Sequence, residues 1–296
     1  MKEPIIVVFG GDKRQISLVR KMTDVLKKVR VFGIPRELLP PAAEYFDDWR
    51  VAVRDCAAVV LPLPTSQDGV RVNLPLGSEK KAPTLAELVD LMPQDAVLAG
   101  GKCGAELVKA AKEREIRLFD YFCSEELQQK NALPTAEGAL EILMHETPRT
   151  IKGLPVGVTG YGRVARALVR VLLALGADVA VAARRQSDLE NAAALGCRTV
   201  RLSEPFDLVR LSADRAAVVN TVPHWIFTEE VLCEMPRDTL ILDLASAPGG
   251  VDPAAAAAQS VRVIWALSLP GKYAPESAGE IIAETLLSYF KEVGIC

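Results

Sequence analysis

The fold of this chain is decided by the stretch Pro155–Ala165, whose sequence is PVGVTGYGRVA and which leads into the helical window Leu168–Leu175. It places the pattern G-x-G-x-x-A between a predicted strand and a predicted helix. Gly160 allows a tight turn, Gly162 lets the backbone approach a diphosphate without a Cβ in the way, and Ala165 lets helix and strand pack closely. The helix start offers free N–H groups to the phosphates. The stretch predicts a dinucleotide-binding turn; the alternative is a purely structural glycine turn.

Short apolar runs alternate with amphipathic windows on both sides of this turn, which is typical of an α/β protein with parallel sheets. In the first half, strands are predicted at residues 5–9, 30–32, 57–61, 96–99 and 117–119, and helices at about 12–28, 84–92 and 104–114. In the second half, strands are predicted at residues 155–159, 178–182, 217–220, 240–244 and 262–265. The predicted fold class is α/β, with two doubly wound parallel-sheet domains of the Rossmann type.

The length of 296 residues suits two domains joined by crossing helices. Pro134 disfavours helix at Leu133 and Thr135 can cap the segment after it, so a helix is predicted to begin there. Paired crossings place a cleft and a hinge between two domains. The predicted organisation is a substrate-binding N-terminal domain at 1–130, a crossing helix at 131–150, a nucleotide-binding domain at 151–276, and a C-terminal helix at 277–292 that packs back on the first domain.

The charge balance excludes several classes of protein. There are 35 Lys and Arg against 38 Asp and Glu, for a net charge of −3, whereas a protein held by nucleic-acid phosphates needs a basic excess. The hydrophobic fraction of 50% excludes disorder. No apolar stretch approaches the ~18 residues that cross a bilayer, because Arg166 and Arg170 interrupt the longest candidate. No secretory signal is recognised, and we expect a cytoplasmic protein without nucleic-acid or membrane partners.

The six cysteines stand 20 residues or more apart, without a C-x-x-C pair or a cluster with histidine. This spacing fits neither a zinc site nor a disulfide framework. We therefore expect reduced thiols and no metal site.

The second strand of the nucleotide-binding domain indicates which dinucleotide binds. An NAD site usually carries Asp or Glu about 20 residues beyond the glycines, to accept from the ribose 2′-hydroxyl. Ala182 stands at that distance from Gly162, and Arg184 and Arg185 come shortly after it. A guanidinium donates charge-assisted hydrogen bonds to a 2′-phosphate. We therefore expect NADP rather than NAD; the alternatives are that both arginines are solvated, or that Asp188 serves the ribose from a longer loop.

Two later loops are expected to flank the nicotinamide, because ligands of open parallel sheets sit outside the carboxyl ends of the strands. They are Asn220–His224, with sequence NTVPH, and Ala245–Gly250, with sequence ASAPGG. Their Asn and Ser can contact ribose or carboxamide; the alternative is that Pro and Gly only close turns. The residues expected to hold the cofactor are Thr159, Gly160, Tyr161, Gly162, Arg163, Val164, Ala183, Arg184, Arg185, Asn220, Thr221, Val222, Pro223 and Ser246.

The first domain lacks the glycine pattern, so the substrate is assigned to it. Its first turn, with sequence GGDKRQ, bares a helix start that Asp12 can cap and from which Arg14 can project. A helix end with an arginine suits a carboxylate, so a small anionic substrate fits. The alternative for Arg14 is a solvated helix residue. The residues expected to bind the substrate, from this turn and from later strand ends and the crossing, are Gly11, Asp12, Arg14, Pro62, Gly101, Lys102 and Thr135.

Three side chains compete for the role of proton-transfer group. His224 lies beside the expected nicotinamide loop, and an imidazole can move a proton at neutral pH. Lys102 and Glu137 are the other candidates, and no spacing separates them. The second histidine, His145, lies late in the crossing helix and is assigned a structural role.

Several segments together resemble the A subunits of dipicolinate synthase from endospore-forming bacteria. The most specific are the start GGDKRQ at 10–15 and the end from Leu269-Pro270-Gly271 to Ala278-Gly279. Two positions depart from the family pattern: Ala165 replaces a third glycine, which costs little there, and Ser268 replaces a glycine, which leaves the shape of the 268–274 loop open. The other resembling segments are 131–138, 157–163, 220–223, 240–246 and 248–252.

This resemblance implies a two-domain shape like that of 2-hydroxyacid dehydrogenases and the oxidation of dihydrodipicolinate to dipicolinate, which accumulates in spores. It also implies a partner, the flavoprotein-like B subunit, together with a place in the mother cell of a sporulating bacterium, and it leaves room for a homo-oligomer. The substrate carries two carboxylates, which Arg14, Lys102 and helix N–H groups can bind.

Two other functions fit the same sequence. The architecture alone equally allows an NADP-dependent dehydrogenase of a 2-hydroxyacid or related small acid. The sparse inventory of catalytic histidines and carboxylates also allows a nucleotide-binding scaffold protein whose chemistry lies in its partner.

Overall fold

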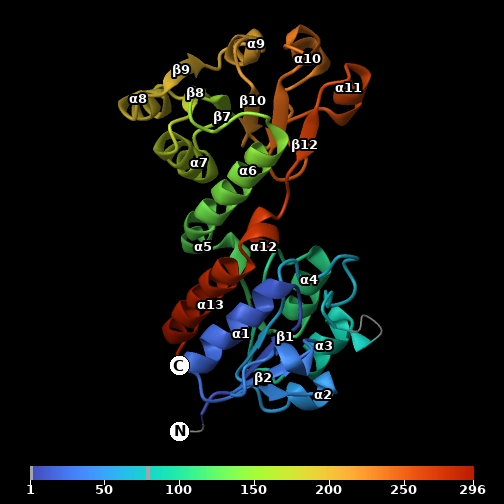
Figure 1. Ribbon diagram of the computed structural model, residues 1–296. Coiled ribbons are helices and arrows are strands. Elements are labelled where there is room, and N and C mark those ends of the chain that lie inside the picture. The colour runs from blue at the N-terminus through green and yellow to red at the C-terminus, as the bar shows by residue number, and fades with distance from the viewer. Residues whose placement is uncertain (1–2, 78–80) are drawn as a thin grey trace. The chain divides into compact units, whose positions relative to one another are not determined.

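The computed structural model describes residues 3–77 and 81–296, and the chain divides into two compact units. Unit 1 comprises Met1–Asn131 and Ala274–Cys296, and unit 2 comprises Ala132–Tyr273 (Figure 1). Each unit is built on a six-stranded sheet in which all neighbouring strands run parallel. The predicted α/β class with two doubly wound sheets is confirmed.

The sheet of unit 1 has the strand order β3-β2-β1-β4-β5-β6, so the direction of winding reverses between β1 and β4. Its strands are β1 (Ile6–Phe9), β2 (Val29–Phe32), β3 (Glu44–Tyr45), β4 (Ala58–Val60), β5 (Val97–Gly100) and β6 (Arg117–Asp120). Its α-helices are α1 (Lys13–Val25), α2 (Trp49–Ala52), α3 (Leu85–Leu91), α4 (Ala105–Glu113), α5 (Glu125–Lys130) and α13 (Pro275–Glu292).

β1 lies in the middle of unit 1, and all of its residues are fully buried. A parallel strand covered on both faces needs a continuous apolar run, which IVVF provides. α1 and α13 lie side by side over one face of this sheet (Figure 1). A Cβ on Gly279 of α13 would meet the carbonyl oxygen of Arg14 in α1 at 2.2 Å, so only glycine permits this approach.

The sheet of unit 2 has the order β12-β11-β10-β7-β8-β9 and reverses between β7 and β10. Its strands are β7 (Pro155–Thr159), β8 (Asp178–Ala183), β9 (Arg198–Arg201), β10 (Ala217–Asn220), β11 (Leu240–Asp243) and β12 (Val263–Trp265). Its α-helices are α6 (Ala132–Glu146), α7 (Arg163–Ala174), α8 (Gln186–Ala194), α9 (Phe206–Ser212), α10 (Glu229–Glu234), α11 (Pro253–Ala258) and α12 (Leu269–Tyr273).

The helix at the start of unit 2 begins earlier than its proline suggests. α6 starts at Ala132, whereas the sequence predicts a start at Thr135. Pro134 is thus the third residue of the helix, where a backbone N–H has no partner within the helix, so proline costs no hydrogen bond there. α6 packs against α7 and α12 within unit 2.

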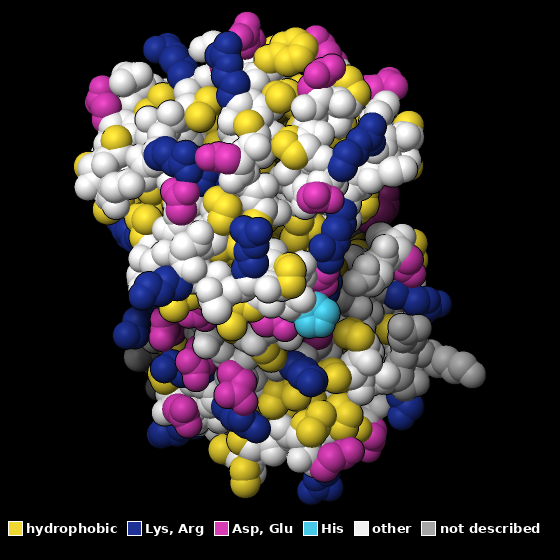
Figure 2. Space-filling view, turned by 45° about the horizontal axis from the view of Figure 1, so that its top comes forward, with side chains coloured by type: hydrophobic (Ala, Val, Ile, Leu, Met, Phe, Trp, Pro, Cys, Tyr) yellow, Lys and Arg dark blue, Asp and Glu magenta, His cyan; other side chains and the backbone are white. Residues whose placement is uncertain are grey.

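Basic and acidic side chains are interspersed on the face shown in Figure 2. None of the described helices is long and apolar enough to cross a membrane. Across residues 3–77 and 81–296, His, Cys, Asp and Glu side chains form no group of three that could hold a metal ion.

Candidate functional site

The turn between β7 and α7 has the geometry that the glycine pattern predicts. Gly160 has a φ of +82°, a left-handed conformation that glycine adopts at little cost. A Cβ there would lie 2.7 Å from Oγ1 of Thr221. Ala165 is fully buried in the core that β7 and α7 share, so the helix passes close to the strand.

The fold itself does not require a glycine at position 162. Gly162 is the N-cap residue of α7, with φ −78° and ψ −166°, an extended conformation open to any residue. A Cβ built on it meets no atom within 4 Å. With no side chain, it also leaves the first N–H groups of the twelve-residue helix uncapped. The space that a Cβ would fill and the uncapped helix start both fit a diphosphate.

The end of β8 carries two arginines and no free carboxylate. Arg184 and Arg185 are exposed, and within the described part of the chain neither forms an ion pair. Arg185 is the N-cap residue of α8 and gives that helix no side-chain cap. Asp188, the nearby carboxylate, is only 17% exposed and pairs with Arg166 at 3.1 Å. Arg166 also donates Nε to the carbonyl oxygen of Tyr161 at 3.0 Å, so Asp188 has a structural partner already.

A buried polar network joins the carboxyl ends of β7, β10 and β11. Thr159, Asn220 and Asp243 end these strands and are at most 1% exposed. Thr159 Oγ1 donates to Asn220 Oδ1 at 2.6 Å, and Asn220 Nδ2 donates to Asp243 Oδ1 at 2.7 Å. Asn220 also accepts from the N–H of Val222 at 3.1 Å and donates to its carbonyl oxygen at 3.0 Å.

Two members of this network, Thr159 and Asn220, are among the residues predicted to bind the cofactor. Buried polar groups must be hydrogen-bonded, and the side chains of Thr159 and Asn220 meet that need with each other and with the next loop. Both side chains hold the strand ends together, and their contact with the cofactor stays a prediction. Of the other predicted cofactor residues, Tyr161 and Ala183 are buried, Gly160, Val164, Thr221 and Val222 are half-buried, and Gly162, Arg163, Arg184, Arg185, Pro223 and Ser246 are exposed.

In unit 1 the first turn after β1 is closed by its own side chains. Asp12 caps α1 and accepts from the backbone N–H of Arg14 at 3.0 Å. The Arg14 guanidinium folds back onto the same carboxylate, with Nη2 2.7 Å from Oδ2, and also donates to the carbonyl oxygen of Leu63. Arg14 is only 7% exposed. The side chains of Arg14 and Asp12 are thus partners in this turn, and their binding of a substrate carboxylate stays a prediction.

The turn after β5 is the more open part of this edge. Lys102 is exposed, has a φ of +58°, and makes no ion pair among the described residues. Its backbone N–H and that of Cys103 donate to the two oxygens of Asp120 at 3.0 and 2.8 Å. Gly104, the N-cap residue of α4, gives that helix no side-chain cap, and a Cβ there meets nothing within 4 Å. A cation beside an uncapped helix start suits a carboxylate.

Neighbouring groups at this edge are unsuited to proton transfer at neutral pH. Burial raises the pKa of the Cys103 thiol to about 12, and burial also raises the pKa of the Tyr121 phenol well above its usual range. Gly11, Pro62 and Gly101, predicted to bind the substrate, are buried and bring no side-chain donor.

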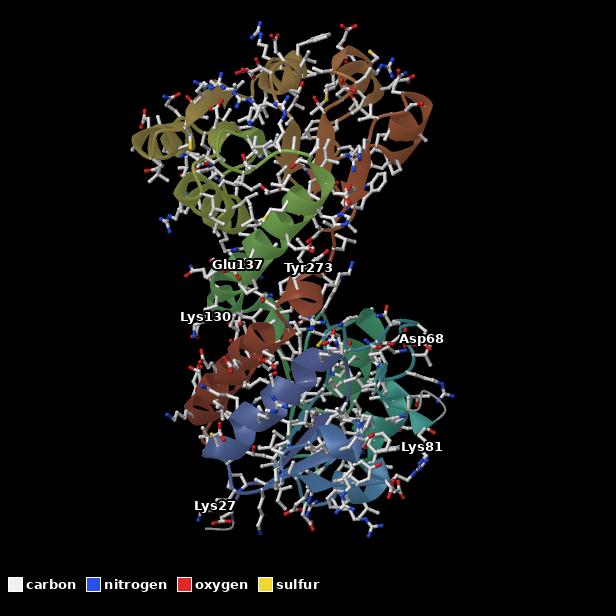
Figure 3. All side chains as sticks on the ribbon, in the orientation of Figure 1. Lys27, Asp68, Lys81, Lys130, Glu137 and Tyr273 are labelled. Atoms are coloured by element: carbon white, nitrogen blue, oxygen red, sulfur yellow. The ribbon has the colours of Figure 1, made fainter. Side chains whose placement is uncertain are left out.

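The proton-transfer candidates lie on separate elements. Glu137 is exposed on α6, as Figure 3 shows, two residues after the half-buried Thr135. His224 is exposed in the loop after β10, where its backbone N–H donates to Val222. Lys102 belongs to unit 1, whereas Glu137 and His224 belong to unit 2. No hydrogen bond joins Glu137 to His224 in the described part of the chain.

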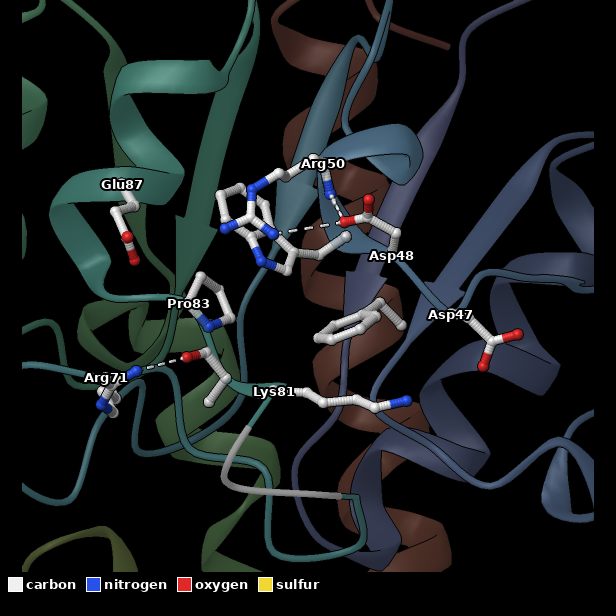
Figure 4. A pocket seen from close by; sticks show the side chains of 10 residues that line it. Asp47, Asp48, Arg50, Arg71, Lys81, Pro83 and Glu87 are labelled. Carbon is white, nitrogen blue, oxygen red and sulfur yellow. Dashed lines mark hydrogen bonds and ion pairs between the residues drawn. The ribbon is translucent and has the colours of Figure 1, made fainter.

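A hollow of about 380 Å³ in unit 1 is lined by several charged side chains, three of which have partners described below (Figure 4). Arg50 pairs with Asp48 at 3.7 Å, and Arg71 donates to the carbonyl oxygen of Ala82 at 2.8 Å. Glu87 accepts from the N–H and the hydroxyl of Thr84, which caps α3. None of the residues predicted to bind the cofactor or the substrate lines this hollow.

Comparison with known proteins agrees with this geometry. A family model for the N-terminal domain of the dipicolinate synthase A subunit matches residues 5–122, and one for the NAD-binding domain of D-isomer-specific 2-hydroxyacid dehydrogenases matches residues 137–258. The chain is 30% identical to the dipicolinate synthase A subunit of Bacillus subtilis over 97% of its length and 96% of that protein.

Solved structures give the same result. The crystal structure of the dipicolinate synthase A subunit from Bacillus halodurans matches with a TM-score of 0.88 and 29% identity, covering 97% of each chain. Its counterpart from Bacillus subtilis matches with a TM-score of 0.87 and 30% identity, over 99% of this chain and 98% of that one. A transhydrogenase from Sinorhizobium meliloti, at 16% identity and a TM-score of 0.71, shares the fold.

The two sheets and the open glycine turn define an oxidoreductase of the dehydrogenase type, whose second unit binds a nicotinamide cofactor. Within that class, the chain belongs to the family of dipicolinate synthase A subunits.

Three residues of the site escape notice in the sequence. Asp243 ends an apolar strand and is buried, Arg166 occupies the nearby carboxylate Asp188, and Asp120 fixes the turn that carries Lys102. A charged residue at the end of a buried strand is the one signal that could have drawn attention to Asp243.

Proposed function

We propose that this chain oxidises dihydrodipicolinate to dipicolinate with NADP as the hydride acceptor. The observation that carries the proposal is the uncapped start of α7 at Gly162, followed at the end of β8 by two exposed arginines. Membership of the dipicolinate synthase A family supports the substrate, because the relatives bear that name.

The reaction removes two electrons and two hydrogens from the dihydropyridine ring. One hydrogen leaves as hydride to C4 of the nicotinamide and the other as a proton to a base, and aromatisation of the ring supplies the driving force. The protein then has mainly to orient the ring, since proximity and orientation can contribute ~7 to 11 kcal/mol. His224, Glu137 and Lys102 are the proposed proton acceptors. A base must be deprotonated to act, so loss of the acidic limb of the pH–rate profile in one alanine variant would identify it.

The preference for NADP over NAD rests on charge at the end of β8. Arg184 and Arg185 precede the uncapped start of the nine-residue helix α8, which adds its own N–H groups to a phosphate site. The carboxylate that could serve a ribose hydroxyl, Asp188, is held by Arg166. Both features favour a 2′-phosphate.

One substrate carboxylate is proposed to bind at the start of α4. Lys102 offers an ammonium group without an acidic partner in the described chain, and Gly104 leaves the helix start uncapped. Asp120 holds the turn in place through two backbone N–H groups. Arg14 is assigned to the structure of the β1–α1 turn.

Turnover of the purified chain tests this function. The chain is incubated with dihydrodipicolinate and NADP while pyridine absorbance is followed, with and without the flavoprotein-like B subunit proposed to be its partner in the mother cell. Turnover by the chain alone supports the proposal in full, and turnover only with the partner supports a shared reaction. Tight NADP binding without turnover in either mixture would point to a scaffold protein, and turnover of 2-hydroxyacids instead would point to the other dehydrogenase class. Gel filtration of the same sample reports the oligomeric state.

A further inference from the structure

Asp243 is a buried carboxylate whose bonds all come from neutral donors. Its Oδ1 accepts from Asn220 Nδ2 at 2.7 Å and from the N–H of Ala245 at 3.1 Å, and its Oδ2 accepts from the N–H of Gly250 at 2.8 Å. All three bonds come from N–H groups, so both carboxylate oxygens act as acceptors. The side chain is 1% exposed, so water does not screen it directly.

No cation compensates this charge among the described residues. Two other carboxylates of unit 2, the buried Asp207 and the half-buried Asp188, have arginine partners: Asp207 pairs with Arg210 and Asp188 with Arg166. Asp243 forms no ion pair with any lysine, arginine or histidine of the described chain. A negative charge held only by dipoles acts over a longer distance than one that is neutralised by a salt bridge.

The position of Asp243 in the sheet places this charge on the nicotinamide side. The diphosphate turn comes after β7, and the two arginines come after β8 on one side of it, whereas β10 and β11 lie on the other side. A dinucleotide that spans the reversal point between β7 and β10 extends its nicotinamide half toward β10 and β11. Asp243 ends β11 and holds the loop Ala245–Gly250 by two backbone bonds.

We propose that Asp243 makes the site discriminate between the oxidation states of the cofactor, favouring the oxidised form. The oxidised nicotinamide ring carries a positive charge and the reduced ring is neutral, while the rest of the two molecules is the same. A buried negative charge on the ring side therefore stabilises one form and not the other. The inference rests on the proposed function only in requiring that a nicotinamide dinucleotide binds to unit 2.

The ratio of the dissociation constants for NADP⁺ and NADPH tests the inference, because it does not depend on turnover. Calorimetry with the wild-type chain gives the reference ratio, in which NADP⁺ binds at least as tightly as NADPH. In Asp243→Asn, a neutral side chain of the same shape, we expect the binding of NADP⁺ to weaken relative to that of NADPH by about tenfold, because only the oxidised ring loses an attractive charge. Asp243→Ser gives a second neutral variant.

Thr159→Val is the matched control, because it removes a neutral member of the same buried network and leaves the charge. A merely structural network predicts that both kinds of variant weaken NADP⁺ and NADPH equally. Three results overturn the inference: an unchanged ratio in the Asp243 variants, an equal shift in Thr159→Val, or a wild-type chain that binds NADPH tenfold more tightly than NADP⁺. The last result needs no variant to fold. Failure of every nicotinamide nucleotide to bind would instead overturn the proposed function.

Discussion

Asp12 and Gly162 occupy the same place in the two units, yet the helix start is capped by a side chain at Asp12 and uncapped at Gly162. Each is the N-cap residue after the first strand of its sheet, with φ −87° and ψ −168° at Asp12 and φ −78° and ψ −166° at Gly162. The backbone is therefore the same, and the side chain makes the difference. Asp12 fills its helix start with a carboxylate, whereas Gly162 leaves it uncapped.

The comparison shows that a helix start in this fold can bind a nucleotide when it lacks the carboxylate side chain that would cap it. The edge of unit 1 satisfies its own N–H groups with carboxylates, through Asp12 at α1, Asp68 in the loop after β4, and Asp120 at the end of β6. In unit 2 the starts of α7 and α8 carry no side-chain cap. The carboxylate that caps α1 in unit 1 thus has no counterpart at α7 or α8 in unit 2, where the first N–H groups of the helices are open to a ligand.

Gly162→Asp would convert the second turn into a copy of the first, with the largest expected effect. The new carboxylate caps α7 and raises stability by a few tenths of a kcal/mol. It also stands where the diphosphate binds, and a like-charge contact costs several kcal/mol, so affinity for NADP falls by about a thousandfold. Calorimetry and thermal unfolding measure the two effects.

Gly104→Asp is the control, since it adds the same charge at the uncapped start of α4 in unit 1. It leaves NADP binding unchanged and raises the KM for dihydrodipicolinate instead. Equal loss of NADP binding in both variants would contradict the assignment of the diphosphate to α7.

Gly10→Ala would show that the glycines of the first turn serve packing. A Cβ on Gly10 meets the backbone carbonyl oxygen of Gly33 at 2.3 Å, and backbone cannot move aside as a side chain can. We expect a loss of about 3 kcal/mol in unfolding free energy, typical of a forced fit in a packed interior. Gly162→Ala, with no atom within reach, should stay within about 0.5 kcal/mol of the wild type. Urea denaturation measures both, and equal stability of the two variants would contradict the contrast.

The double variant Arg184→Ala, Arg185→Ala tests whether the open edge of unit 2 also receives a 2′-phosphate. Charge-assisted bonds contribute about 1.5 to 3 kcal/mol each, so the KM for NADP should rise by about a hundredfold while that for NAD changes little. Steady-state kinetics with both cofactors decide this. An unchanged ratio of the two KM values means that the arginines are solvated.

Acid should destabilise the loop after β4, which is held by hydrogen bonds to the carboxylate of Asp68. Asp68 accepts from the N–H groups of Arg71 and Val70 and from the Ser66 hydroxyl, and these bonds lower its pKa to about 2. A lowered pKa stabilises the loop above the ordinary value of 3.8, and that stability is lost as the pH falls from there to about 2. Hydrogen-exchange protection of the Val70 and Arg71 amides should decline in this window and be flat with pH in Asp68→Asn.

The secondary-structure elements that the sequence predicts well are those with a clear pattern of apolar residues. Pro155–Thr159 and Ala217–Asn220 are predicted with the bounds that the structure has, because both are buried runs closed by turns. β3 (Glu44–Tyr45) and β9 (Arg198–Arg201) were not predicted, since they are edge strands with mostly exposed polar residues. Their pairing comes from the neighbouring strand rather than from their own pattern.

The parts of the site that a backbone motif defines could be predicted from the sequence. The hydrogen-bond partners of side chains that have several polar neighbours could not. The glycine turn and the arginines after β8 are evident from spacing alone. Arg14 could not be assigned, because an arginine two residues after an N-cap Asp can reach either solvent or that Asp, and the structure shows the second. The partnership of Asn220 with Asp243 depends on the strand order, which places β11 beside β10.

The close approach of Gly279 in α13 to Arg14 in α1 has a consequence for the folding of the chain during its synthesis. Unit 2 is one continuous segment that is complete at Tyr273, whereas unit 1 lacks one side of its interior until Ile282, Leu286 and Phe290 have been synthesised. Unit 1 therefore cannot complete its interior until the last helix has been synthesised, which departs from the usual order in which an N-terminal domain folds first. A chain cut after Tyr273 would contain the whole nucleotide-binding unit but a first unit that lacks one side of its interior.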